Sequence, residues 1–262
     1  MSDKKSVVDT NYLRAAAKML EGVKMRSYEF MAIKPGQTLL DVGCGPGIDT
    51  VALAKMVGEN GRVVGIDHDE AMIKEADRYA AESGVASRIS HKQADVYALP
   101  FEDNTFDSCR SERLFQHLLQ PEQALDEMIR VTKSGGWVVV LDTDWGAISM
   151  DTPEVDIERR LARFRAEHML ANGYAGRQLY RLFGLAKLGE IKVEGFTTIS
   201  TDYEIGRYIA MIDKTEKEAL AAGVITEDEL RRLRAGSERA RDEGLTFGSG
   251  CIILTAGRKV SG

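Results

Sequence analysis

The chain has 262 residues, 44% of them hydrophobic, and a formal net charge of −6 at pH 7. This length and apolar content suffice for one sizeable core, and the negative charge makes nucleic acid an unexpected partner. The first ten residues lack the apolar segment of a secretory signal, and no apolar run is long enough to cross a membrane. Three widely spaced cysteines without a C-x-x-C pair favour reduced thiols, so we expect a cytoplasmic protein without a membrane span.

The first half of the chain alternates short apolar runs with helical patterns, which predicts a parallel sheet wrapped by helices. Residues 1–34 should hold one or two N-terminal helices, ahead of a cofactor-binding core at 36–142. Within that core we expect strands at 38–42, 62–66, 88–94, 106–110 and 137–141. We expect helices at 48–57, 70–83 and 121–131, and a turn at 134–136.

After position 142 the pattern changes. Helices are predicted at 153–170 and 177–188, separated by Asn172-Gly173, and we expect residues 144–188 to form an inserted, hinged cap over the carboxyl edge of the sheet. Residues 189–262 should supply strands at 191–199 and 249–255 and charged helices at 203–222 and 226–243. Since the sequence has no internal repeat, a single domain is expected over 1–262.

The stretch LLDVGCGPGI, at 39–48, ends the first predicted strand with Asp41 and a glycine turn. Such a turn before a helix places backbone N–H groups around a ligand. The dinucleotide pattern G-x-G-x-x-G would need glycine where the chain has Ile48, and Asp41 would repel a pyrophosphate. A cationic ligand without phosphate, such as S-adenosylmethionine, reverses that argument.

Two further acidic residues follow predicted strands. Asp67 ends the second strand, where a carboxylate can accept both ribose hydroxyls, and Asp95 follows the third, where it can accept from an adenine amine. Acidic residues at three strand ends around one glycine turn are more specific than the glycines alone. The sequence therefore favours a nucleoside with a cationic tail.

The motifs LLDVGCGPG, VVGIDHDEAMI, QADVYALPFEDNTFD and ALDEMIRVTKSGGWVVVLD cover about 36–142. Through them the chain resembles class I S-adenosylmethionine-dependent methyltransferases of the small-molecule group similar to ubiquinone/menaquinone C-methyltransferases. The resemblance implies a Rossmann-like, doubly wound, seven-stranded sheet with an antiparallel last strand, and S-adenosylmethionine as cofactor. It implies that the glycines line the methionine moiety, that the acidic strand ends hold ribose and adenine, and that Ser111 lies near the cofactor carboxylate. The residues predicted to bind the cofactor are Asp41, Gly43, Cys44, Gly45, Gly47, Asp67, His68, Asp95, Val96, Ser111 and Tyr28.

Glu112 and His117, after the fourth predicted strand, are candidate catalytic bases, because methylation of O, N or C releases a proton. Methyl transfer depends mostly on in-line positioning, however, so a base is not required. Glu112 could instead be a solvated residue at a helix start, and His117 a packing residue in a loop. Tyr12, Asp144 and Trp145 are candidates for the substrate pocket. No metal site is expected, since the one Asp-Asn pair of the chain, at 103–104, precedes the fourth strand.

The predicted function is methyl transfer to a small-molecule acceptor, such as a quinone, polyketide or terpenoid. Two alternatives stay open: an S-adenosylmethionine-binding protein that does not transfer methyl, and a nicotinamide-dependent oxidoreductase. The sequence also leaves open the acceptor, the methylated atom and a homodimeric state. Arginines at 159, 160, 163 and 165 could meet an anionic substrate, although a solvated helix face explains them as well.

Overall fold

A computed structural model describes residues 21–260 of the chain, so the predicted pocket residue Tyr12 lies outside the described residues. One sheet of seven strands runs through it in the order β3-β2-β1-β4-β5-β7-β6. The strands are β1 (Thr38–Val42), β2 (Arg62–Asp67), β3 (Ile89–Gln93), β4 (Phe106–Glu112), β5 (Thr132–Met150), β6 (Gly189–Ser200) and β7 (Gly248–Arg258). The strands β1 to β5 pair in parallel, whereas β7 pairs antiparallel with both β5 and β6. The predicted seven-stranded sheet with an antiparallel last strand is thereby confirmed.

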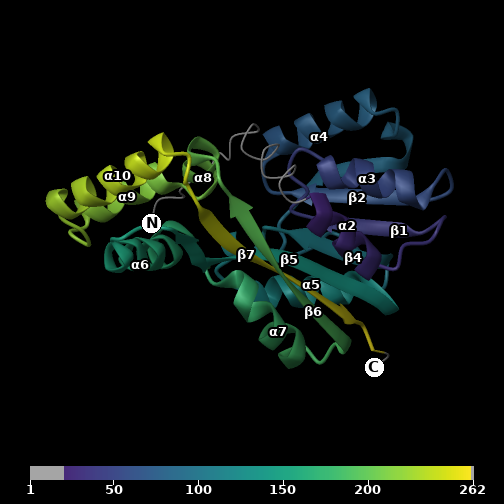
Figure 1. Cartoon of the computed structure of the whole chain (residues 1–262). Helices are drawn as coiled ribbons and strands as arrows, with labels where there is room; N and C mark the ends of the chain where they lie inside the picture. Colours follow the sequence, from purple (N-terminus) through teal and green to yellow (C-terminus); the bar gives the residue numbers. More distant parts are fainter. Residues whose placement is uncertain (1–20, 261–262) are drawn as a thin grey trace.

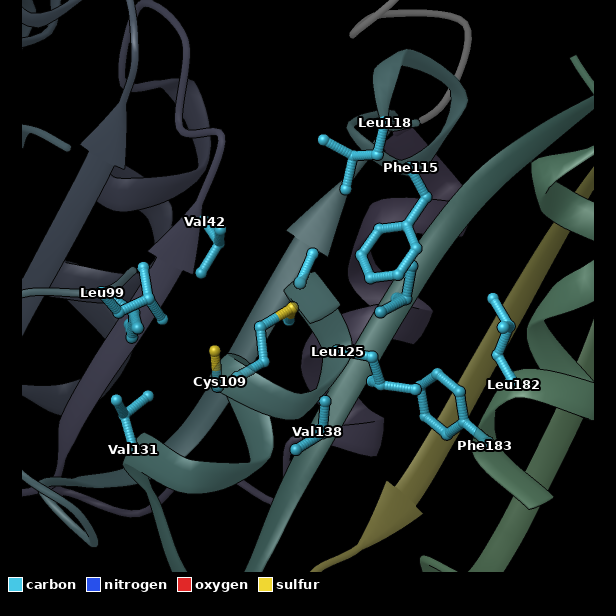
Figure 2. Close-up of a cluster of buried hydrophobic side chains, with 14 of the residues drawn as sticks. Val42, Leu99, Cys109, Phe115, Leu118, Leu125, Val131, Val138, Leu182 and Phe183 are labelled. Atoms are coloured by element: carbon cyan, nitrogen blue, oxygen red, sulfur yellow. The ribbon is translucent and has the colours of Figure 1, made fainter. Parts of the chain in front are cut away.

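Helices cover both faces of the sheet, because alternate side chains of the central strands are apolar on both sides. Leu39, Val139 and Leu141 pack with α2 (Glu21–Phe30), α3 (Ile48–Val57) and α4 (Glu70–Glu82), on what we call the α2 face. The opposite, α5 face is covered by α5 (Pro121–Val131) and α7 (Ala175–Leu185) (Figure 1). Figure 2 shows this second core, in which Leu125 of α5 lies between Val138 of β5 and Phe183 of α7.

A third group of helices lies beyond one end of the sheet, near the end of β6 and the start of β7 (Figure 1). This helical layer, as we call it, consists of α6 (Val155–Phe164), α8 (Tyr203–Ile209), α9 (Ile212–Ala221) and α10 (Glu227–Asp242). It has its own apolar cluster, which includes Leu161, Ala219 and Leu233. None of the helices described is long and apolar enough to cross a membrane.

The cap predicted over 144–188 was wrong in its composition. Residues 144–150 continue β5, and α7 lies in the main core, with Leu179, Leu182 and Phe183 buried on the sheet. Of the two predicted cap helices, α6 alone joins the helical layer, and the other three members come from the insertion between β6 and β7. An apolar helix stripe indicates that one face is covered, but it does not identify the covering surface.

Two local predictions also differ from the structure. The turn predicted at 134–136 is an irregularity inside β5: Thr132 pairs with Phe106 but Trp137 with Ser108, and Gly135 has a φ of +78°. The single helix predicted at 203–222 is divided into α8 and α9, because Met211 has a φ of +52° and breaks the helical path.

Candidate functional site

The turn after β1 brings three glycines to the end of β2. Gly43, Gly45 and Gly47 have φ values of +75°, +50° and +80°, a region that glycine adopts without Cβ strain. The N–H groups at positions 43 and 44 both donate to one β2 carbonyl oxygen at 2.8 Å. A Cβ at Gly47 would lie 2.9 Å from the Cβ of Ala76, whereas one at Gly45 would meet no atom within 4 Å. The turn is therefore packed against α4 and open at Gly45.

Asp67, the last residue of β2, contacts this turn directly. Its Oδ2 accepts from the Gly45 N–H at 2.9 Å, and its Oδ1 accepts from the Asp69 N–H at 3.0 Å. The side chain of His68 is exposed, with Nδ1 3.2 Å from Asp67 Oδ1. Each carboxylate oxygen keeps a further lone pair, because an ionised carboxylate can accept about four hydrogen bonds. Asp67 is thus held in place and can still accept from ligand hydroxyls.

The other predicted cofactor residues surround the same edge of the sheet. Asp95 follows β3 and is exposed, and the neighbouring Val96 is half-buried. Ser111 on β4 is buried, and its Oγ has no hydrogen-bond partner among the described residues. Burial raises the pKa of the Cys44 thiol well above its usual range, so this side chain is uncharged. The described residues include no group of three His, Cys, Asp or Glu side chains that could hold a metal ion.

Beside the glycine turn, on the α2 face, lies a buried group of charged and polar side chains from α2, β1, α3 and β4. Arg110 is at its centre: Nη1 lies 3.3 Å from Asp41 Oδ1 and 3.2 Å from Asp49 Oδ1, and Nη2 lies 2.9 Å from Glu112 Oε2. Lys24 Nζ lies 2.7 Å from both Asp49 Oδ2 and Glu112 Oε2. The members of this buried ion cluster are Lys24, Tyr28, Asp41, Asp49, Arg110 and Glu112.

The buried ion cluster changes the interpretation of three predicted residues. Asp41 is only 2% exposed and contacts Arg110, so its carboxylate does not stand free to face a cationic ligand. Burial raises its pKa to about 7. The Tyr28 hydroxyl donates to Asp49 within the cluster, so it is bonded to another side chain and not to a cofactor. Glu112 is held by two cations, which leaves it poorly suited to act as a general base.

The loop after β4 carries a second hydrogen-bonded network. The Trp145 indole N–H, which can only donate, donates to Gln116 Oε1 and so fixes the orientation of that amide. Gln116 Nε2 then donates to the Arg113 carbonyl oxygen at 2.9 Å and to His117 Nε2 at 3.2 Å. Because His117 Nε2 must accept, its proton is on Nδ1 and the ring is neutral.

The electrostatics of this loop agree with a neutral ring. Although the residue is exposed, desolvation of its imidazole and the nearby Arg113 guanidinium lower the pKa of His117 to about 4. Asp67 and His68 also lie close enough for their charges to act on it. His117 therefore stands between the glycine turn and Trp145.

Sequence reasoning assigned no role to Asp142 or Gln116, which position this loop. Asp142 is fully buried, accepts from the Gln116 N–H at 3.2 Å and from the Thr143 N–H at 2.7 Å, and burial raises its pKa to about 7. An acidic residue directly after the apolar run at 137–141 was the available signal. No local sequence pattern could identify Gln116, because its partner Trp145 is 29 positions away.

Next to this edge lies an open pocket of about 1070 Å³, part of it continuous with solvent. We call it the C-terminal pocket, because it lies between the ends of β5, β6 and β7 and the helices α8 and α10. Of the predicted pocket residues, Trp145 lines it but Asp144 does not: Asp144 points to the α5 face and accepts from Arg177 Nε at 2.6 Å. Other lining residues are Thr143, Ile148, Met150, Tyr203, Phe247 and Ile252.

The methyltransferase domain family matches residues 33–185. An uncharacterized 37.1 kDa protein in transposon TN4556 of Streptomyces fradiae is 33% identical over 205 residues, 76% of this chain and 59% of that protein. A demethylmenaquinone methyltransferase of Desulfitobacterium hafniense is 38% identical over 122 residues, 47% of this chain and 48% of that enzyme. The solved structure of the YcgJ protein of Bacillus subtilis is similar with a TM-score of 0.65 and 19% identity, over 94% of this chain and 99% of that one.

The chain thus spans between 48% and 59% of the length of these two curated relatives. The likeness to the solved structure concerns the fold alone. The family match covers more than half of the chain and includes the glycine turn, Asp67, Asp95 and the loop that carries His117. On that match, the chain belongs to the methyltransferase domain family.

Proposed function

We propose that the chain transfers a methyl group from S-adenosylmethionine to a small-molecule acceptor held in the C-terminal pocket. The observation that carries the proposal is that Asp67 contacts the glycine turn, which is open at Gly45. The loop that contacts Trp145 in the pocket wall follows a neighbouring strand end. Cofactor and acceptor would therefore meet at the carboxyl edge of the sheet, where open α/β folds bind their ligands.

The residues at this edge suit the parts of S-adenosylmethionine. The open turn at Gly45 leaves room for the methionine moiety, and the remaining lone pairs of Asp67 can accept both ribose hydroxyls. Asp95 is exposed where it can accept from the adenine amine, and Ser111 Oγ, without a described protein partner, can donate to the methionine carboxylate. When bound, the cofactor supplies a methyl group activated by its sulfonium.

The protein's part in the reaction is chiefly to position the acceptor, because displacement at a sulfonium methyl requires an in-line approach. With a pKa of about 4, His117 is a weak base at neutral pH, and in its Nδ1–H form it can donate a hydrogen bond to the acceptor. We therefore assign to His117 an orienting role, and to Glu112 a structural role in the buried ion cluster.

Calorimetric titration with S-adenosylhomocysteine tests the cofactor assignment. We expect Asp67→Ala to weaken binding about 10- to 100-fold, since each charge-assisted hydrogen bond contributes roughly 1.5–3 kcal/mol. Asp103→Ala is the matched control, because this exposed carboxylate lies before β4, at the opposite edge of the sheet. Unchanged affinity in Asp67→Ala would contradict the ribose assignment.

A turnover assay tests the reaction itself. The wild-type chain, supplied with S-adenosylmethionine labelled in its methyl group, should transfer label to at least one member of a panel of phenols, quinols and terpenoids. Binding of S-adenosylhomocysteine without transfer across that panel would favour the non-methylating alternative. Binding of NAD in place of S-adenosylhomocysteine would contradict the proposal outright.

A further inference from the structure

We propose that the C-terminal pocket selects an acceptor that is uncharged and largely apolar. The inference rests on the proposed function and adds a substrate class to it. Most of the pocket lies outside the residues matched by the methyltransferase domain family, which end at 185. Its preference must therefore be derived from its own side chains.

Most of the exposed surface of the pocket is apolar. Trp145, Ile148 and Met150 come from the end of β5, and Ile252 faces them from the neighbouring β7. Phe247, just before β7, is 44% exposed and stands where the pocket opens to solvent. A pocket with this lining fits a molecule with an apolar ring system or chain.

The cations near the pocket already have partners in the protein. Arg207 of α8 contacts Glu216 at 3.0 Å, forms an ion pair with Asp213, and lies over the Tyr203 ring at 5.4 Å. Arg113 Nε lies 3.7 Å from Glu112 Oε1. An anionic acceptor would therefore have to compete with carboxylates that are built into the fold.

The arginines of α6 are also committed to protein partners. Arg159 donates to the Ile148 carbonyl oxygen at 2.8 Å, and Arg160 donates to that of Val224 at 2.7 Å. Arg165, the residue that follows α6, is only 2% exposed; its Nη1 donates to the Ala210 carbonyl oxygen at 3.1 Å, at the corner between α8 and α9, and its Nε has no hydrogen-bond partner among the described residues. Arg159 thus attaches α6 to β5, and Arg160 and Arg165 connect parts of the helical layer, so the alternative of arginines that meet an anionic substrate is not favoured.

The acidic groups at the pocket offer equally little to a cation. Asp202 Oδ1 accepts from the Ile205 N–H at 2.9 Å as the N-cap of α8, and Asp151 is exposed to solvent. What remains inside is a set of neutral hydroxyls, among them Thr198 and Ser249. An anionic acceptor would lose hydration without gaining a free counter-ion, and a cationic one would meet only the exposed, well-hydrated carboxylates of Asp151 and Asp202, whereas a neutral acceptor has no charge to desolvate.

Three matched probes separate the possibilities: 2-naphthol, which is neutral at pH 7, 2-naphthoate, an anion, and 2-(aminomethyl)naphthalene, a cation. Binding to the full chain is measured calorimetrically with and without S-adenosylhomocysteine. We expect 2-naphthol to bind at least about tenfold more tightly than either charged probe. A tighter charged probe, or no binding by any of the three, would overturn the proposal.

Two variants locate the binding. Phe247→Ala should weaken 2-naphthol binding several-fold, and Tyr180→Ala, which truncates an aromatic side chain 63% exposed on the far helix α7, should leave it unchanged. Equal effects of the two variants would contradict binding in the C-terminal pocket. If the wild-type chain prefers 2-naphthol but does not bind S-adenosylhomocysteine, the proposed function fails and the pocket assignment stands.

Discussion

Gln116 determines which nitrogen of His117 carries the proton. Its amide is oriented by the Trp145 indole, so a donor rather than an acceptor faces His117 Nε2. A protonated ring would set two donors against each other, which adds to the desolvation and the Arg113 charge that depress the pKa of His117 to about 4. The neutral ring is thus a product of three side chains together.

We predict that Gln116→Glu raises the pKa of His117, because a carboxylate at that position accepts from a protonated ring. The variant's ring should stay protonated to higher pH than the wild-type ring, which becomes neutral above about pH 4. The measurement is a ¹⁵N NMR pH titration of the His117 ring. Gln37→Glu, at the amino end of β1, adds the same charge away from the loop and should leave the titration unchanged.

The same shift links His117 to stability. Because its pKa is lower in the folded chain than the ordinary value of 6.5, its contribution is fully present above about pH 6.5 and is lost as the pH falls through about 4. In Gln116→Glu this acid-side loss should be smaller, because the folded and unfolded pKa values of His117 lie closer together. A titration curve identical to that of the wild type would show that the Gln116 amide does not control the ring.

Individual site residues differed in how well the sequence could place them. Asp67 could be predicted, because a strand, its end and the glycine turn are local patterns that meet at one sheet edge. The surroundings of Asp41 could not be, because its partner Arg110 is 69 positions away and lies in a stretch, CRSER, that reads as solvated. Burial of a charge depends on such distant partners.

At the scale of elements, α2 is attached to the sheet by charge as well as by apolar packing. Lys24 reaches Asp49 at the start of α3 and Glu112 at the end of β4, both at 2.7 Å and with little solvent access. Its removal would leave three carboxylates with Arg110 as their one remaining cation in the buried ion cluster.

We therefore predict that Lys24→Met lowers the free energy of unfolding by about 3–5 kcal/mol, the usual cost of breaking a buried ion pair. The measurement is urea denaturation at pH 7. Lys74→Met is the matched control: its side chain is 72% exposed and pairs with Glu70 on the surface of α4, so a loss below about 1 kcal/mol is expected. Equal losses would show that the buried ion cluster does not stabilise the fold.

Element existence was easier to predict than element partnership. The strands β1 to β4 were expected within two residues of their observed bounds, because glycines and prolines punctuate short apolar runs, whereas β5 extends well beyond the predicted 137–141 at both ends. The position of α7 on the sheet was missed, since Leu179 and Phe183 form the same stripe whether they face a sheet or a lid. The break at Met211 was missed too, because the sequence has neither Gly nor Pro there.

At the scale of the whole molecule, the helical layer and the sheet have separate apolar cores. The layer's cluster consists of side chains from α6, α9 and α10 and the loop between the last two, and no sheet residue belongs to it. Ion pairs such as Arg160–Glu229 and Arg234–Glu216 connect its helices across partly exposed surfaces. Two cores that share no apolar residues should open at different free energies.

We predict that, in native-state hydrogen exchange, the α7 amides are protected as strongly as those of the central strands. The amides of α9 and α10 should exchange through a local opening of lower free energy. Addition of 2-naphthol should slow exchange in α8 and α10, because both line the C-terminal pocket. Equal protection of α7 and α10 without ligand would show that the molecule opens as one unit. Salt should speed exchange in the layer selectively, since it screens exposed ion pairs.

The pairing of β5 with β7 has one more consequence. After Asp144 pairs with Cys251, the next pair is Ser149 with Ser249, so β5 advances five positions while β7 advances two. The extra residues of β5 can absorb an insertion or a deletion. The β5–β7 pairing before them then keeps its register, so its side chains stay on the same faces of the sheet. The wall proposed to meet the acceptor could thus be rebuilt by mutation while the half proposed to meet the cofactor keeps its alignment. If the C-terminal pocket holds the acceptor, such a division makes new specificities accessible in small steps.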